Sequence, residues 1–201
     1  MMMRVAVAVS GRGSNLEALV RALDADTAAR VELVVSNRPE AGGLERARAH
    51  GIAAEVLPDP DEASDWLARL ERHRIDLVVL AGYLRLVPAP VVLRYRDRVV
   101  NVHPALLPAF GGRGMYGRHV HEAVLRSGAL ESGATVHLVD EAYDRGAVLA
   151  QGRVPVLPDD TPDTLAARVL DVEHRLLPAV LRAAAVAGHF VPLSEPVGST
   201  P

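Results

Sequence analysis

The stretch RVAVAVSGRGSNL, residues 4–16, indicates how this chain begins to fold. Residues 4–10 are a short apolar run ended by glycine, as expected for a strand that is buried on both faces of a parallel sheet. Residues 16–23 follow with apolar side chains at helical spacing. We therefore expect a strand, a tight glycine turn and a helix.

The same alternation continues along the first half of the chain, with strands at 30–36, 52–57, 76–81 and 98–103 and helices at 41–50, 61–74 and 88–95. The second half predicts an irregular stretch at 104–117, a helix at 118–127, two hairpin strands at 133–140 and 147–155, and a long helix at 162–187. Alternating strands and helices predict a single-domain, doubly wound α/β fold. Its mostly parallel sheet has helices on both faces, with a Rossmann-like N-terminal half. The domain should cover residues 4–190, and residues 191–201 read as a polar tail.

The composition excludes several classes of function. Of 201 residues, 49% are hydrophobic and 23% charged, which fits a globular domain with a large core. The net charge of −3 gives no general case for nucleic acid or an anionic membrane. The chain has neither cysteine nor lysine, which excludes disulfides, thiolate nucleophiles and Schiff bases. With no secretory pattern and no apolar window of ~18 residues, we expect a cytoplasmic protein.

The turn Ser10–Asn15 lies where a strand ends and a helix begins. Backbone N–H groups and the helix dipole favour an anion there. The alternative is a tight turn in which Ser14 or Asn15 only caps the helix. Position 16 is leucine and the second strand ends in Ser36-Asn37, so the stretch lacks the dinucleotide fingerprint. A monophosphate is favoured over NAD.

Asn101 and His103 lie two positions apart at the end of a predicted strand, so their side chains share one face. Ligands of parallel sheets bind at this strand end, and Pro104 and Pro108 impose an irregular loop over it. An asparagine donor and a histidine that titrates near neutral pH suit acyl transfer to an amine, which forms an oxyanion and moves a proton. The alternative is that both side chains only satisfy backbone groups of the loop.

The remaining histidines and carboxylates give weaker evidence for a functional site. His119 and His121 diverge by about 200° on a helix and cannot share a metal ion there. His137 lies inside a predicted strand and reads as a structural histidine. The loop 140–146 carries three carboxylates, which fits either a solvated turn or a carboxylate that orients His103 and raises its pKa.

Several motifs between Val5 and Pro178 occur in one recognisable order: SGRGSNL, SNRPEAGGLERA, LAGYLR, NVHPALLP, GATVHLVDEAYDRG and VEHRLLP. With these motifs the chain resembles the phosphoribosylglycinamide formyltransferases. The resemblance implies transfer of a formyl group from 10-formyltetrahydrofolate to the amine of glycinamide ribonucleotide in de novo purine biosynthesis. It also implies that both partners are small molecules, that no metal or bound cofactor is needed, and that the protein forms a homodimer.

The resemblance assigns catalytic roles to three residues. Asn101 would bind the formyl oxygen, His103 would transfer the proton, and Asp144 would support the imidazolium. The Leu107-Pro108 junction would be bent and cis.

The resemblance also assigns binding roles. Gly13, Ser14 and Asn15 would bind the phosphate of the ribonucleotide, and Glu173 would bind its ribose. The residues that would bind folate, the co-substrate, are Leu84, Arg85, Leu86, Val87 and Asn101.

Two segments depart from the family pattern. Asp61-Glu62 stand where many members have an arginine for the folate tail, and residues 109–118 are unusually rich in glycine. With no lysine in the chain, we expect Arg12 and Arg113 to supply positive charge near the phosphate.

Other activities remain as alternatives. One is a formyltetrahydrofolate hydrolase, which would typically carry an additional N-terminal regulatory domain, and another is an inert phosphosugar-binding domain. A methionyl-tRNA formyltransferase is disfavoured, because a C-terminal domain or a basic face would be expected.

Overall fold

The computed structural model describes residues 2–23 and 28–193. Most of the predicted tail, residues 194–201, lies outside the described residues. Before that point, the Leu193 N–H donates to the Leu149 carbonyl at 2.8 Å, so the chain still packs against the sheet there. Along the described residues, no helix combines the length and the apolar character that a membrane span requires.

The core of the molecule is one seven-stranded sheet with the order β3-β2-β1-β4-β5-β6-β7. Its first five strands are parallel: β1 (Met3–Val9), β2 (Ala29–Ser36), β3 (Ala53–Val56), β4 (Leu77–Leu80) and β5 (Val99–His103). The last two are antiparallel: β6 (Glu131–Leu138) and β7 (Val148–Pro155). The doubly wound, mostly parallel sheet predicted from the sequence is confirmed. Strand β6 begins two residues before its predicted start, at Glu131 instead of position 133.

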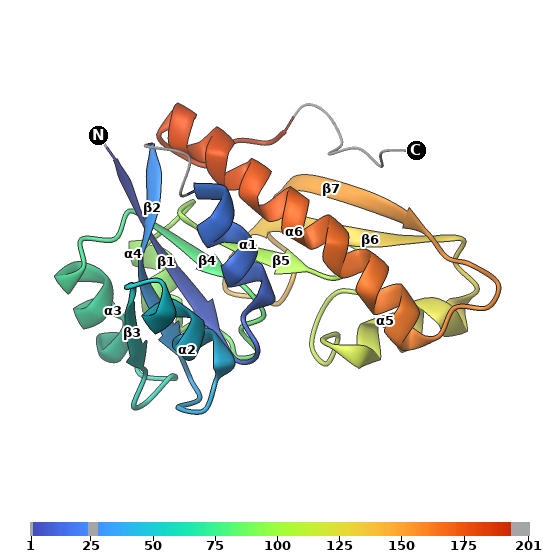
Figure 1. Cartoon of the computed structure of the whole chain (residues 1–201), viewed down its shortest axis with the longest axis horizontal. Coiled ribbons are helices and arrows are strands. Elements are labelled where there is room, and N and C mark those ends of the chain that lie inside the picture. Colours follow the sequence, from blue (N-terminus) through green and yellow to red (C-terminus); the bar gives the residue numbers. More distant parts are fainter. Residues whose placement is uncertain (1, 24–27, 194–201) are drawn as a thin grey trace.

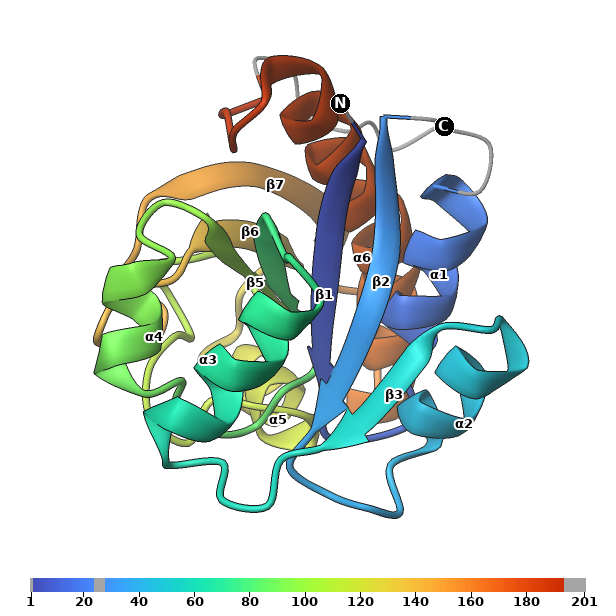
Figure 2. The ribbon, with the colours of Figure 1, turned by 90° about the vertical axis from the view of Figure 1, so that its left-hand side faces the viewer.

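In the described part of the chain, six helices cover the two faces of this sheet: α1 (Ser14–Leu23), α2 (Gly42–Ala49), α3 (Ala63–Arg72), α4 (Ala89–Arg94), α5 (Arg118–Ser127) and α6 (Pro162–Ala187). Helices α1 and α6 lie along one face, and α3 and α4 lie on the other (Figures 1 and 2). Alternate side chains of β1 supply both cores, with Val7 packed among residues of α1 and α6 and Ala8 among residues of α3 and α4. This is why the strand reads as a continuous apolar run.

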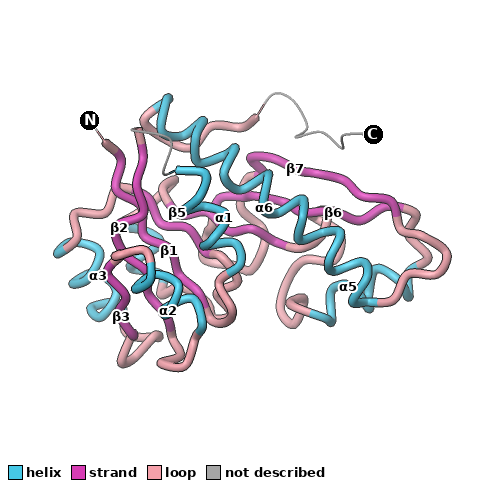
Figure 3. The backbone as a smooth tube through the Cα atoms, in the orientation of Figure 1, coloured by secondary structure: helices cyan, strands magenta, loops and turns pink. Residues whose placement is uncertain are grey.

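The carboxyl ends of β1, β4 and β5 lie at the same edge of the sheet. Ser10 joins two of these ends, because its N–H donates to the Gly82 carbonyl at 3.0 Å and its hydroxyl accepts from the Leu84 N–H at 2.9 Å. The loops that leave this edge are the irregular segments after β1, β4 and β5 (Figure 3). Polar residues that are far apart in the chain therefore meet here, at the edge where parallel sheets bind ligands.

Candidate active site

A cavity of about 830 Å³ opens at this edge. The turn after β1, the end of β5, the loop 112–118 and the helices α5 and α6 surround it. Its wall includes Asn15, Asn101, His103, Asp144 and Glu173, all predicted site residues. The structure thus brings both ends of the predicted site into one space.

His103 is the last residue of β5 and is only 3% exposed. Its Nε2 lies 2.8 Å from the Phe110 carbonyl and donates to it, which leaves Nδ1 without a proton in the neutral ring. Burial lowers the pKa of His103 below its ordinary value, although the nearby Asp144 charge opposes the shift. The Asp144 carboxylate raises this pKa, as the sequence predicts, but the effect of burial is larger. At neutral pH His103 is therefore an uncharged base.

Asp144 connects the histidine to the rest of the site. Its Oδ2 lies 3.6 Å from His103 Nδ1 and accepts from the Gly112 N–H at 2.9 Å. Burial raises the pKa of Asp144, but the neighbouring His137 and His103 rings and the hydrogen bond from the Gly112 N–H outweigh burial and hold the pKa below its ordinary value. The carboxylate stays ionised and can stabilise a proton that arrives on His103 Nδ1.

The glycine-rich segment 109–118 braces both residues. The Phe110 carbonyl holds His103, and the Gly112 amide holds Asp144. A Cβ on Gly111 would lie 2.5 Å from Leu107 Cδ2 and 3.2 Å from the Asp144 Cβ, so a larger residue there would displace these side chains. The Leu107-Pro108 bond that leads into the segment is cis, as the resemblance implies. The glycine-rich segment 109–118 therefore contacts the candidate catalytic residues directly.

Asn101 is oriented by a residue that the sequence interpretation left out of the site. Its Nδ2 lies 3.1 Å from His137 Nε2, while His137 Nδ1 lies 2.8 Å from the Leu138 carbonyl. With the His137 proton on Nδ1, Nε2 accepts from Asn101. His137 is a buried histidine with satisfied ring nitrogens, as the sequence predicts, and its contacts also reach Asn101 and Asp144. Asn101 and His137 are direct partners across β5 and β6. The register of these two strands, which the sequence analysis did not assign, is what places His137 beside Asn101.

The second amide hydrogen of Asn101 is held more weakly. Nδ2 lies 3.5 Å from Asp144 Oδ1, at the limit of a hydrogen bond. A ligand oxygen can take this hydrogen without breaking the shorter bond to His137.

The opposite end of the cavity is formed by the start of α1 and the middle of α6. Gly13 has φ 76°, and a Cβ there would lie 2.6 Å from Gly43 Cα, so glycine is required at this position. Ser14 and Asn15 lie inside α1, and the Asn15 Nδ2 donates to Glu173 Oε2 at 2.5 Å instead of capping the helix. The capping alternative is therefore wrong for Asn15.

Glu173 is a buried carboxyl group, 7% exposed. Burial raises its pKa to about 7, in spite of the opposing hydrogen bond from Asn15. The Asn15 Oδ1 is buried and has no partner among the described residues. This end of the cavity thus keeps hydrogen-bonding capacity that the protein does not use.

The predicted folate segment borders the reacting end. Arg85, Leu86 and Val87 line a small cavity together with Asn101 and Asp144, and Leu84 lines the main cavity. Arg85 forms an ion pair with Asp61, one of the two acidic residues that depart from the expected pattern. The acidic residue at this position therefore holds Arg85 at the rim.

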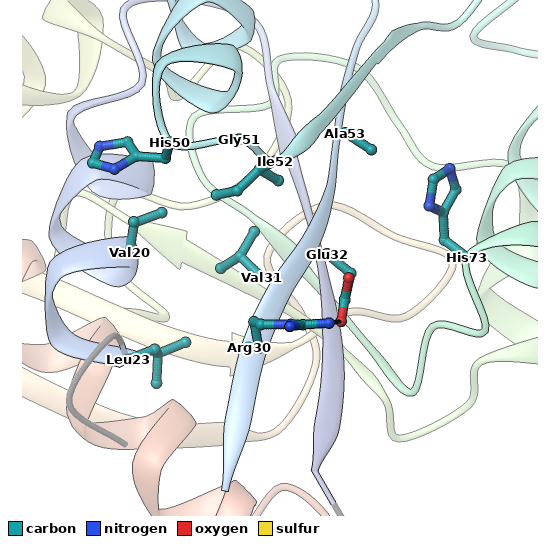
Figure 4. Close-up of a pocket in the computed structure, with 10 residues that line it drawn as sticks. All are labelled: Val20, Leu23, Arg30, Val31, Glu32, His50, Gly51, Ile52, Ala53 and His73. Atoms are coloured by element: carbon teal, nitrogen blue, oxygen red, sulfur yellow. Dashed lines mark hydrogen bonds and ion pairs between the residues drawn. The ribbon is translucent and has the colours of Figure 1, made fainter. Parts of the chain in front are cut away.

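A separate cavity of about 440 Å³ lies between α1, β2 and β3 (Figure 4). Its two histidines are already paired, His50 with Glu17 at 3.2 Å and His73 with Glu55 at 2.8 Å. Unlike the main cavity, it contains none of the predicted site residues. Among the residues the structure describes, no group of three histidines and carboxylates could hold a metal ion.

The fold and this cluster together define a class of protein. It is an α/β protein whose mixed sheet presents an asparagine, a histidine and an aspartate to a cavity beside a glycine turn. Residues 3–181 match the model of a protein family described as formyl transferase. The chain belongs to this formyl transferase family.

Individual relatives show which members of this family the chain is similar to. The chain is 46% identical over 188 residues to the chloroplastic phosphoribosylglycinamide formyltransferase of Arabidopsis thaliana, which covers 90% of this chain but 64% of that protein. A crystal structure of phosphoribosylglycinamide formyltransferase from Brucella melitensis superposes with a TM-score of 0.83 at 42% identity, covering 100% of both chains. A formyltetrahydrofolate deformylase from Pseudomonas syringae has the same TM-score, 0.83, but 26% identity, with 62% of its chain covered. The chain thus spans less than two thirds of the plant relative.

Proposed function

We propose that this protein transfers the formyl group of 10-formyltetrahydrofolate to the amine of glycinamide ribonucleotide, a step of de novo purine biosynthesis. The convergence of Asn101, His103 and Asp144 beside the glycine turn is the observation that carries the proposal. Membership of the formyl transferase family and the names of its relatives support it.

The reaction uses each residue for one task. The amine nitrogen attacks the formyl carbon, and the carbonyl oxygen becomes an oxyanion to which Asn101 Nδ2 donates. His103 accepts the amine proton at Nδ1, between the ring and Asp144 Oδ2, where the 3.6 Å separation is too long for a good direct hydrogen bond. The carbon–nitrogen bond to the folate then breaks, and the proton passes from His103 to the leaving nitrogen. Tetrahydrofolate and formylated glycinamide ribonucleotide are the products.

One set of residues binds the ribonucleotide and another binds the folate, on either side of this cluster. The start of α1, at Gly13, Ser14 and Asn15, binds the phosphate through backbone N–H groups. Glu173 binds the ribose hydroxyls, and its Asn15 partner fixes its orientation. Leu84, Arg85, Leu86 and Val87 bind the folate next to Asn101. No metal or bound cofactor takes part in these steps.

The test is spectroscopic detection of tetrahydrofolate release by the purified protein. The proposal expects release only when 10-formyltetrahydrofolate and glycinamide ribonucleotide are both present. Release with the folate alone would instead favour a hydrolase, the activity named for the deformylase relative. Binding of the ribonucleotide without any turnover would favour an inert phosphosugar-binding domain.

We also infer a cytoplasmic location, as the composition and pattern of the sequence predict, and a homodimer, as the family resemblance implies. Fractionation of cells that express the full protein tests the location. Light scattering coupled to size-exclusion chromatography tests the dimer, and a monomer mass would contradict it.

A further inference from the structure

One polar group in the main cavity has no role in the reaction described so far. His121 lies on α5, lines the cavity and is only 5% exposed. Its Nδ1 is buried and has no hydrogen-bond partner among the described residues. A buried polar atom without a partner destabilises the folded protein. Such an atom on the wall of a cavity is best explained if a ligand supplies the partner.

His121 lies near His103, at the end of the cavity where the reaction is proposed to occur. Burial lowers the pKa of His121, and the nearby His103 lowers it further. Both rings are therefore uncharged at neutral pH. His119, two residues earlier on the same helix, has a side chain that is 66% exposed, so α5 directs one histidine outward and the other inward.

An attacking amine needs two acceptors in this space. It carries two hydrogens: one leaves to a base during formyl transfer, and the other remains as the N–H of the amide product. His103 Nδ1 is placed to take the first. Asp144 and the carbonyl of Phe110 are already engaged with other donors. Of the groups described at this end, His121 Nδ1 is a buried acceptor that no protein donor uses.

We propose that His121 is a further catalytic residue, whose Nδ1 accepts the retained hydrogen of the attacking amine and so directs the nitrogen lone pair at the formyl carbon. The proposal rests on the proposed function, since it requires an amine substrate. It leaves the proton balance unchanged, because His121 accepts a hydrogen bond and takes no proton. The proton on its own ring then resides on Nε2.

Two substitutions separate the nitrogens of the ring. His121→Asn puts an amide oxygen near the position of Nδ1, whereas His121→Gln reaches toward the position of Nε2. We expect His121→Gln and His121→Ala to lower kcat/KM for glycinamide ribonucleotide about tenfold or more, as for the loss of one well-placed hydrogen bond. His121→Asn should recover most of the loss. In all three variants the KM for 10-formyltetrahydrofolate should stay within about twofold of wild type.

The matched control is His119→Asn, which changes an exposed histidine on the same helix and should leave all constants unchanged. Thermal unfolding of every variant checks the fold. If His121→Asn and His121→Gln have equal kcat/KM, or if both substrates are affected alike, the proposal is wrong. Wild type in the same assay separates the two hypotheses. Absent turnover there contradicts the proposed function and this role with it, whereas normal turnover with unaltered variants contradicts the role of His121 alone.

Discussion

The two ends of the main cavity are built in different ways. At the reacting end, Asn101, His103 and Asp144 all have protein partners, which are His137 and the backbone of the glycine-rich loop. At the anchoring end, Asn15 and Glu173 bond mainly to each other, and the Asn15 Oδ1 has no partner among the described residues. The protein itself therefore orients the candidate catalytic groups, before any substrate binds. The groups proposed to hold the ribonucleotide keep hydrogen-bonding capacity that this ligand would complete.

This difference has an energetic reason. Groups that stabilise a charge in the transition state are most effective when they need no reorganisation, and partners such as His137 fix the Asn101 amide in advance. Groups that bind a substrate must exchange water or a weak partner for it. The buried Glu173 carboxyl, with a pKa near 7, can lose or gain a proton as the ligand arrives.

His103→Ala tests the reacting end with the largest expected effect. Loss of the base should lower kcat by about 10²- to 10⁴-fold, the usual contribution of a general acid and base. The KM for glycinamide ribonucleotide should change little, because the phosphate and ribose groups stay in place. Steady-state kinetics with both substrates measures the two constants separately. A raised KM with an unchanged kcat would show that His103 only binds substrate.

Asn101→Ala should lower kcat by about 10²- to 10³-fold, as expected when one oxyanion donor is removed. His137→Phe, which keeps Asn101 but removes its partner, should cause a smaller loss of kcat in the same direction. The assay is the same steady-state measurement with saturating substrates. Full activity in His137→Phe would mean that the pre-orientation of Asn101 has no catalytic value.

The reacting end was also the more predictable of the two. Asn101 and His103 follow from the alternation of side chains along one strand and from the prolines after it. Local patterns could not choose Asp144 among the carboxylates of loop 140–146, and only the family resemblance indicated it. In the structure the Asp144 carboxylate lies beside His103 and accepts from the Gly112 N–H, a contact across 32 positions of sequence.

The anchoring end depends on contacts of even longer range. Asn15 and Glu173 are 158 positions apart, and neither stands in a local pattern that predicts the other. The alternation of strands and helices was sufficient for the fold, because each buried strand is apolar on both faces. It could not predict that α6 crosses the sheet face with Glu173 directed at the first turn of α1.

Glu173→Gln tests the anchoring end through stability. The pKa of Glu173 is raised from 4.5 to about 7, so the folded state keeps a proton that the unfolded state releases between these values. The contribution of this group to stability is thus fully present below pH 4.5 and is lost as pH rises through about 7. At higher pH the loss should reach about 3 kcal/mol, which Gln should not show.

The measurement is the free energy of unfolding in urea at about pH 5 and about pH 8, for wild type and variant. Subtracting the two proteins removes the common titration of the buried histidines. Parallel pH dependences would contradict the raised pKa.

Arg12→Ala gives the smallest expected effect and tests whether side-chain charge assists the anchoring end. Arg12 is among the residues that line the cavity and forms no ion pair among the described residues, while its carbonyl accepts from Arg46 Nε at 2.8 Å. Because Arg12 is exposed, water and salt screen its charge. The KM for the ribonucleotide should therefore rise only several-fold, and less at high ionic strength. Arg21→Ala, which removes an exposed arginine of α1 already paired with Glu17, is the matched control and should leave the KM unchanged. An equal KM in wild type and Arg12→Ala would leave the backbone of residues 13–15 as the sole phosphate ligand of this turn.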